Sequence, residues 1–169
     1  MTPMTLAEAL QATRSCAADA SPYHVALACG FTPLHLQTFF HGHLQSRSPR
    51  RKVQLRTGLF GDLIGTVEKL DSDLDAAAIA IEWTDIDPRL GFRQLGGWKP
   101  SQMAALPAAF EARLRQLEAG IRVAAAKFSV VVSLPSLPLP PAFHTANVKF
   151  STTALQLRSA IASDRKSVV

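Results

Sequence analysis

Four short strand-like runs, separated by longer amphipathic stretches, constrain the fold of this chain more than any other feature. They lie at 24–29, 52–55, 76–83 and 128–134, and all but the second are almost wholly apolar. Such runs are typical of parallel strands buried on both faces, with helices between them as covers. We therefore predict an α/β fold, a three-layer sandwich of the flavodoxin or SGNH type. It has a mostly parallel sheet of about four strands and helices on both faces.

Capping residues and apolar spacing locate the helices between these runs. Thr5 and Glu8 have the spacing of a capping box, and Pro22 ends that first helix by Ser21. Thr32 and Pro33 are expected to be the N-cap and first residue of the next helix. Apolar periodicity predicts further helices over 63–70, from Ser101 to about 127, and over 151–163.

The composition is that of a globular domain, because 47% of the 169 residues are apolar and only 18% are charged. The longest unbroken apolar run, Ala76 to Ile81, is far too short to cross a membrane. The first residues also lack the basic region of a secretory signal. We expect a cytoplasmic protein without a membrane partner.

The cysteines and the charge distribution bear on two further classes of function, metal binding and nucleic-acid binding. Cys16 and Cys29 form no CxxC pair or metal-spaced cluster, so no metal site and two free, buried thiols are expected. The net charge of +5 comes largely from a basic run that contains Arg50, Arg51 and Lys52. That run fits a phosphate contact or a solvated loop before a strand. Since no nucleic-acid motif accompanies it, no nucleic-acid partner is expected.

Ligands of open α/β sheets bind at the carboxyl ends of the strands, and this rule selects the candidate site residues. Gly30 and Thr32 follow the first strand, where Thr32 fits either a nucleophile or a simple helix cap. Gly58 lies in a glycine-rich turn that has neither a P-loop nor a GxGxxG pattern. His144, beyond a proline-rich run, is the histidine best placed for a site.

The segment after the third strand carries three carboxylates and an indole. Glu82, Trp83 and Asp85 could hold a substrate or serve general acid–base chemistry. Alternatively, Asp85 or Asp87 caps a short turn before Pro88 while Trp83 packs. The sequence is compatible with both interpretations.

The last six residues, 164–169 (DRKSVV), resemble the translation of a sequencing adapter that runs into a stop codon. We therefore expect an N-terminal helix over 1–21, an α/β domain over 22–163 that is incomplete at its C-terminus, and an artefact over 164–169.

Four stretches, 24–44, 58–63, 78–91 and 137–144, resemble the N-terminal, SGNH-hydrolase-like domain of FkbH-like biosynthetic proteins. The resemblance implies a following phosphatase-like domain of the HAD superfamily, which would use Mg²⁺. In FkbH-like proteins this phosphatase-like domain is associated with loading a glyceryl unit onto an acyl carrier protein, in polyketide or surface-polysaccharide synthesis. The HAD motif DxDxT is absent here, so no cofactor is expected in this chain. Phe31 and Thr32 stand where the hydrolases have aspartate and serine.

Two functions follow from this resemblance. The first is an accessory domain that positions a substrate or an acyl carrier protein, which would contact Arg50, Arg51 and Lys52. Gly30, Gly58, Glu82 and Trp83 are then the predicted substrate-binding residues. The second is an acyl-ester hydrolase or acyltransferase with a degenerate site formed by Thr32, Asp85 and His144. The sequence leaves the oligomeric state open.

Overall fold

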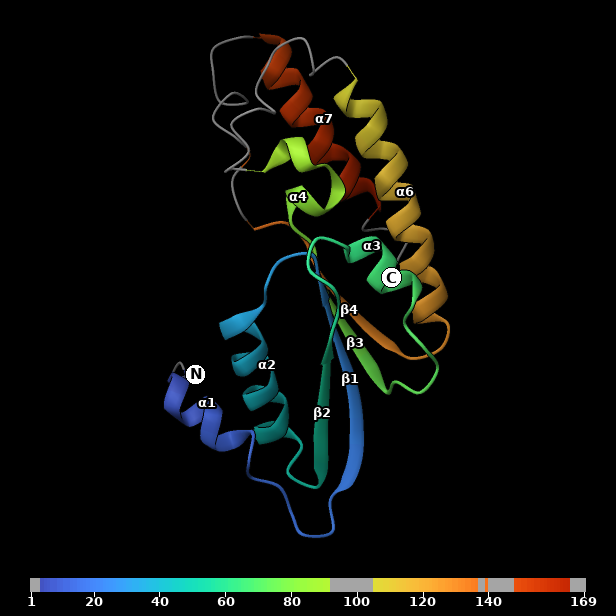
Figure 1. Cartoon of the computed structure of the whole chain (residues 1–169). Helices are drawn as coiled ribbons and strands as arrows, with labels where there is room; N and C mark the ends of the chain where they lie inside the picture. The colour runs from blue at the N-terminus through green and yellow to red at the C-terminus, as the bar shows by residue number, and fades with distance from the viewer. Residues whose placement is uncertain (1–3, 92–104, 137–138, 140–147, 165–169) are drawn as a thin grey trace.

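The computed structural model describes residues 4–91, 105–136, 139 and 148–164, and it contains one four-stranded parallel sheet (Figure 1). The strand order is β2-β1-β3-β4, and every neighbouring pair is parallel. The strands are β1 (Ser21–Cys29), β2 (Arg51–Thr57), β3 (Ala76–Ala80) and β4 (Ser129–Ser133). The predicted α/β fold with a parallel sheet of four strands is confirmed.

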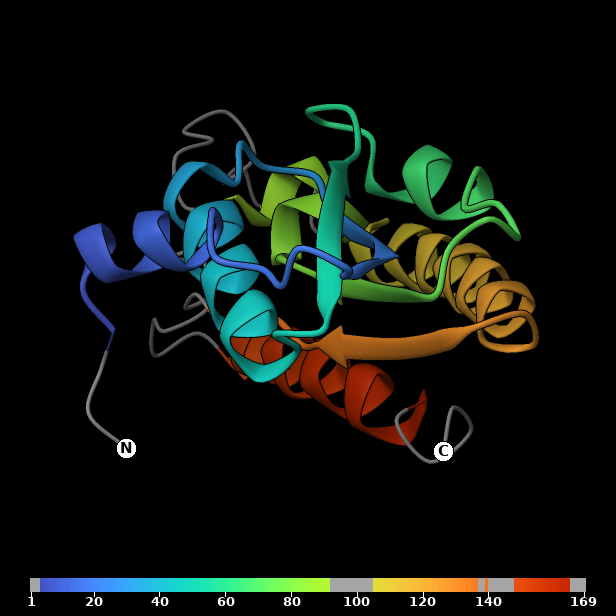
Figure 2. The same cartoon turned by 90° about the horizontal axis from the view of Figure 1, so that it is seen from below.

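Helices lie on both faces of this sheet, which gives three layers (Figures 1 and 2). One layer holds α1 (Leu6–Ala12) and α2 (Leu34–Arg47). The other holds α3 (Leu63–Glu68), α6 (Leu106–Ala125) and α7 (Val148–Asp164). A short helix α4 (Trp83–Ile86) and the 3-10 turn η1 (Pro88–Leu90) follow β3 at the carboxyl end of the sheet.

The main core lies between the sheet and the layer of α3, α6 and α7. Helix α6 supplies Phe110, Leu114, Leu117 and Ile121, whose spacing places them on one face of the helix. The sheet and the neighbouring helices contribute further buried residues, among them Ala28, Ile79, Leu63, Val67, Leu157 and Ile161. Helix α6 therefore buries one apolar face against the sheet and its neighbouring helices.

Helix α1 packs closely on α2 at a glycine. A Cβ atom on Gly42 would lie 2.9 Å from the Cα of Ala9, so only glycine allows this approach. The predicted capping box is present: the backbone N–H of Thr5 donates to Glu8 at 2.7 Å, and the N–H of Glu8 donates to the Thr5 hydroxyl at 3.3 Å. The short first helix is thus held by its cap and by α2.

Several element boundaries differ from those predicted. Helix α1 ends at Ala12, well before Ser21, where β1 already begins. Helix α2 begins at Leu34, and Pro33 occupies the N-cap position without a side-chain hydrogen bond, so the expected cap at Thr32 is wrong. Helix α7 begins at Val148, three residues before the predicted start. The predicted helix start at Ser101 lies outside the described residues.

The third strand is also shorter than predicted. It ends at Ala80, because the segment from Trp83 turns into α4 instead of extending the sheet. The two cysteines are free, as predicted, but only Cys29 is buried and Cys16 is exposed. Among the described residues, no helix combines the length and apolar character needed to cross a bilayer.

Candidate functional site

The direction of chain progression reverses at β1, because β2 lies on one side of it and β3 on the other. At such a topological switch point, open α/β sheets bind ligands outside the carboxyl ends of the two adjacent strands, which are β1 and β3 here. Gly30 follows β1 directly, and the segment from Glu82 to Asp85 follows β3. The fold therefore brings these three predicted site residues to one place.

The side chain of Asp85 lies directly over Gly30 at this switch point. Its Oδ2 accepts a hydrogen bond of 2.8 Å from the backbone N–H of Glu82, and the backbone of Gly30 is a second hydrogen-bond partner. A Cβ atom on Gly30 would lie 2.9 Å from the Cγ of Asp85 and would contact Oδ1 even more closely. The carboxylate of Asp85 thus occupies the space that the absent side chain of Gly30 leaves.

Burial shifts the pKa of two ionisable side chains beside Gly30, those of Asp85 and Cys29. It raises the pKa of Asp85, and the nearby carboxylate of Glu82 raises it further, while the backbone hydrogen bonds of Glu82 and Gly30 oppose the shift. Burial also raises the pKa of the Cys29 thiol, with a further contribution from Asp85. The Cys29 thiol donates to the carbonyl of Phe31 at 3.3 Å. This environment disfavours the thiolate that a nucleophilic cysteine needs.

The other polar residues after β3 stabilise local structure. Asp87 is 5% exposed and accepts hydrogen bonds from the backbone N–H and the guanidinium of Arg89, at 2.9 Å and 2.6 Å. Trp83 is buried, with its ring centroid 6.2 Å from that of Phe110. Asp87 therefore caps a turn, here the one that begins at Pro88, and Trp83 packs in the core. For these two residues the structure agrees with the structural interpretation and not with ligand binding.

Glu82 links the ends of two strands. The hydroxyl of Ser136 donates to the Glu82 carboxylate at 2.8 Å, which joins the end of β3 to the segment that follows β4. Nothing in the sequence pattern singled out Ser136, because it lies in a proline-rich run whose path the sequence did not reveal. The carboxylate of Glu82 thus ties the end of β3 to the segment after β4.

Thr32 is exposed in the connection between β1 and α2. Within the part of the chain that the structure describes, no side chain forms a hydrogen bond with its hydroxyl. The predicted partner His144 lies outside the described residues. Among the described residues, Thr32 therefore has an accessible hydroxyl that is not hydrogen-bonded to a general base.

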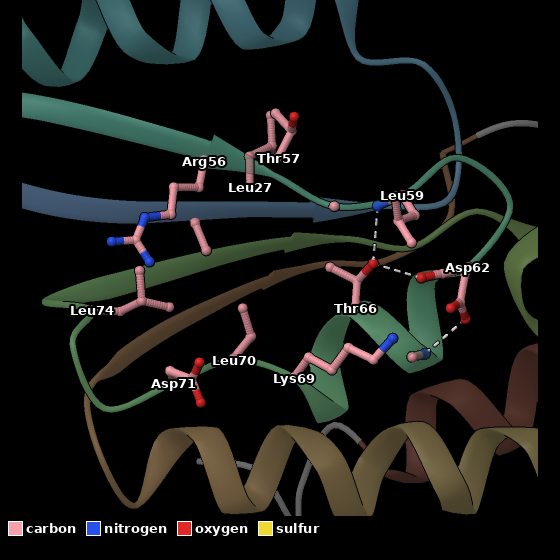
Figure 3. A pocket seen from close by; sticks show the side chains of 13 residues that line it. Leu27, Arg56, Thr57, Leu59, Asp62, Thr66, Lys69, Leu70, Asp71 and Leu74 are labelled. Atoms are coloured by element: carbon pink, nitrogen blue, oxygen red, sulfur yellow. Dashed lines mark hydrogen bonds between the residues drawn. The ribbon is translucent and has the colours of Figure 1, made fainter.

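Gly58 lines a cavity of about 220 Å³ that lies between the end of β2 and helix α3 (Figure 3). A Cβ atom on Gly58 would lie 2.8 Å from the Cβ of Thr66, so the glycine allows α3 to approach β2 closely. The Thr66 hydroxyl accepts a hydrogen bond from the N–H of Leu59 at 3.3 Å and donates to the carbonyl of Asp62 at 2.6 Å. The predicted site residue Gly58 therefore belongs to a different hollow from Asp85.

The three basic residues predicted to contact a carrier protein lie at the start of β2. Arg51 is engaged within the chain: it pairs with Asp75 at 3.2 Å, and its guanidinium lies 4.5 Å from the centre of the Tyr23 ring. Arg50 and Lys52 are exposed. Since β2 has seven residues, at about 3.3 Å each, this basic end lies about 20 Å from Gly58.

No group of three or more His, Cys, Asp or Glu side chains in the described ranges could hold a metal ion. The chain matches no protein-family model, no curated protein and no solved structure. The resemblance to FkbH-like proteins therefore stays a prediction from the motifs.

Proposed function

We propose that this chain is a non-catalytic accessory domain that positions a substrate or carrier protein for an HAD-type enzyme, as in cytoplasmic FkbH-like proteins. One observation carries the proposal. The Asp85 side chain, held by the Glu82 and Gly30 backbones, lies at the switch point, where folds of this topology hold their ligands. A switch point occupied by the chain's own carboxylate is better suited to a structural role than to turnover of a substrate.

The environment of Thr32 supports the same proposal. A hydroxyl nucleophile needs a base within hydrogen-bonding distance to become reactive, and no such contact involves Thr32 in the described residues. Asp85 is engaged by backbone groups, and burial raises its pKa. These two predicted catalytic residues thus lack the mutual contact that a catalytic pair requires.

The basic start of β2 supports an acidic protein as the partner. Arg50 and Lys52 are exposed, and exposed charges of one sign speed the association with an oppositely charged surface. Arg51 contacts Asp75 and Tyr23, so its side chain ties the start of β2 to the neighbouring segments of the sheet. In this proposal an acyl carrier protein docks at this end of the sheet, away from the switch point at the other end.

Isothermal titration with an acidic acyl carrier protein tests the docking site. At low salt we expect the double variant Arg50→Gln/Lys52→Gln to bind at least about fivefold more weakly than the parent chain, with a smaller dependence on salt. The control Arg14→Gln/Lys127→Gln removes the same charge from exposed positions elsewhere and should keep the parent affinity. Equal affinities for all three chains would refute this docking site.

The alternative function, acyl-ester hydrolysis, is favoured by one observation, the exposed hydroxyl of Thr32 after β1. A Thr32→Ala variant separates the two functions. We expect the parent chain and the variant to show the same background rate with short acyl esters. Hydrolysis by the parent chain that is lost in the variant would establish the alternative and overturn the accessory role.

A further inference from the structure

The cavity between β2 and α3 has a largely apolar lining. Leu27, Leu70 and Leu74 are buried residues that line it. Leu59 lines it as well, although 66% of its surface is exposed. An exposed leucine next to buried leucines provides a surface that an aliphatic group would remove from water.

The loop between β2 and α3, which contributes to the lining of this cavity, is held by short contacts. The carbonyl of Gly30 accepts a hydrogen bond of 2.7 Å from Gly61, whose positive φ of 76° turns the loop. Beyond that turn, the carboxylate of Asp62 accepts from the N–H of Gly65 at 2.8 Å and caps α3. These contacts fix the loop beside the cavity in the absence of a ligand, so we expect little ordering of this loop on binding.

The charged groups around the cavity are not equivalent. Arg56 forms an ion pair of 2.6 Å with Asp73, and Asp62 is engaged in the cap of α3. The side chain of Lys69 forms no ion pair or hydrogen bond within the described residues. Figure 3 shows its side chain running along α3 toward Thr66, whereas Asp71 lies beyond the end of that helix. A ligand at the Leu59 end therefore meets the ammonium of Lys69.

We propose that this cavity binds a short acyl group, with its alkyl chain on the leucines and its acyl oxygen hydrogen-bonded to Lys69. The volume of about 220 Å³ is below the range of about 300–1,000 Å³ typical of larger ligands, which favours a chain of about five carbons. The same group can arrive as a free carboxylate or as a carrier-bound thioester. Only the carrier-bound thioester rests on the proposed function. The cavity lies at the carboxyl end of β2, the strand that begins with the basic residues.

Nuclear magnetic resonance titration of the ¹⁵N-labelled chain tests the proposal with three probes: pentanoate, S-pentanoyl-N-acetylcysteamine and 1-pentanol. Pentanoate and the thioester should shift the amide signals of Leu59, Thr66 and Lys69 in a saturable manner. Pentanol lacks the acyl oxygen and should bind at least about threefold more weakly than pentanoate. A stronger response to the thioester than to pentanoate would identify the carrier-bound source.

Three exposed substitutions make the result specific to this cavity. Lys69→Gln should weaken pentanoate binding about tenfold, because a charge-assisted hydrogen bond is lost. Leu59→Ser should weaken binding of all three probes about threefold. The control Arg14→Gln, at an exposed position after α1, should bind like the parent chain.

Two results would overturn the proposal. One is no saturable shift with either acyl probe, and the other is equal pentanoate affinity in the parent chain and Lys69→Gln. Neither readout involves a carrier protein, so the failure of docking at Arg50 and Lys52 is a separate outcome.

Discussion

Replacement of Gly30 by alanine tests whether the Asp85 carboxylate lies at the switch point. The added Cβ would lie 2.9 Å from the Cγ of Asp85 and closer still to Oδ1. The carboxylate cannot yield at low cost, because the backbones of Glu82 and Gly30 hold it. We therefore expect Gly30→Ala to destabilise the fold through a steric conflict with one identified side chain.

The magnitude follows from two contributions. Overpacking a well-packed site costs about 1–3 kcal/mol, and weakening the hydrogen bonds of a carboxylate adds about 1.5–3 kcal/mol. Together they predict a loss of about 3 kcal/mol or more in the free energy of unfolding. For a chain of 169 residues, that corresponds to a Tm lower by about 6–12 °C.

A double-mutant cycle isolates the cause. In an Asp85→Ala background the conflicting carboxylate is gone, so the additional Gly30→Ala change should cost less than about 1 kcal/mol. Urea unfolding of the parent, the two single variants and the double variant, monitored by circular dichroism, measures all four corners. Additive effects of the two substitutions would refute the arrangement of Asp85 over Gly30.

Three other predictions concern stability. Gly42→Ala should destabilise the chain by about 2 kcal/mol in urea unfolding, since its Cβ would lie 2.9 Å from Ala9; no loss would mean that α1 does not dock as described. Burial lowers the pKa of His41 below its ordinary value of 6.5. The unfolded chain therefore binds more protons, and stability should fall as the pH drops through about 6.5. A His41→Leu variant that keeps the full slope would contradict this assignment. Val131 is 70% exposed, so Val131→Lys should change the free energy of unfolding by less than about 0.5 kcal/mol, and a larger loss would show that this face of the sheet is covered.

The sequence was most informative where local periodicity determines structure. Apolar runs of strand length and the spacing of Leu114, Leu117 and Ile121 report burial directly, because a residue's neighbours along the chain decide which face it occupies. The capping box of Thr5 and Glu8 is equally local. Boundaries were less predictable, as at Pro33, where a helix start depends on the path of the preceding loop.

At the candidate site, too, the sequence predicted some features and missed others. The rule for strand ends was enough to select Gly30, Gly58, Glu82 and Asp85. It did not show that Gly30 and Asp85 lie together at the switch point while Gly58 lines a separate cavity. Trp83 looked available for a ligand, yet it packs on Phe110.

By itself, then, the sequence determined the fold class and the alternation of strands and helices along the chain, and it selected the strand ends as candidate binding positions. Only the tertiary structure decided that the Asp85 side chain fills the switch point, that Arg51 is tied to Asp75, and that Lys69 faces an apolar hollow. The reason is physical. Periodicity and capping act between residues a few positions apart, whereas these contacts join segments that the sheet brings together from distant parts of the chain.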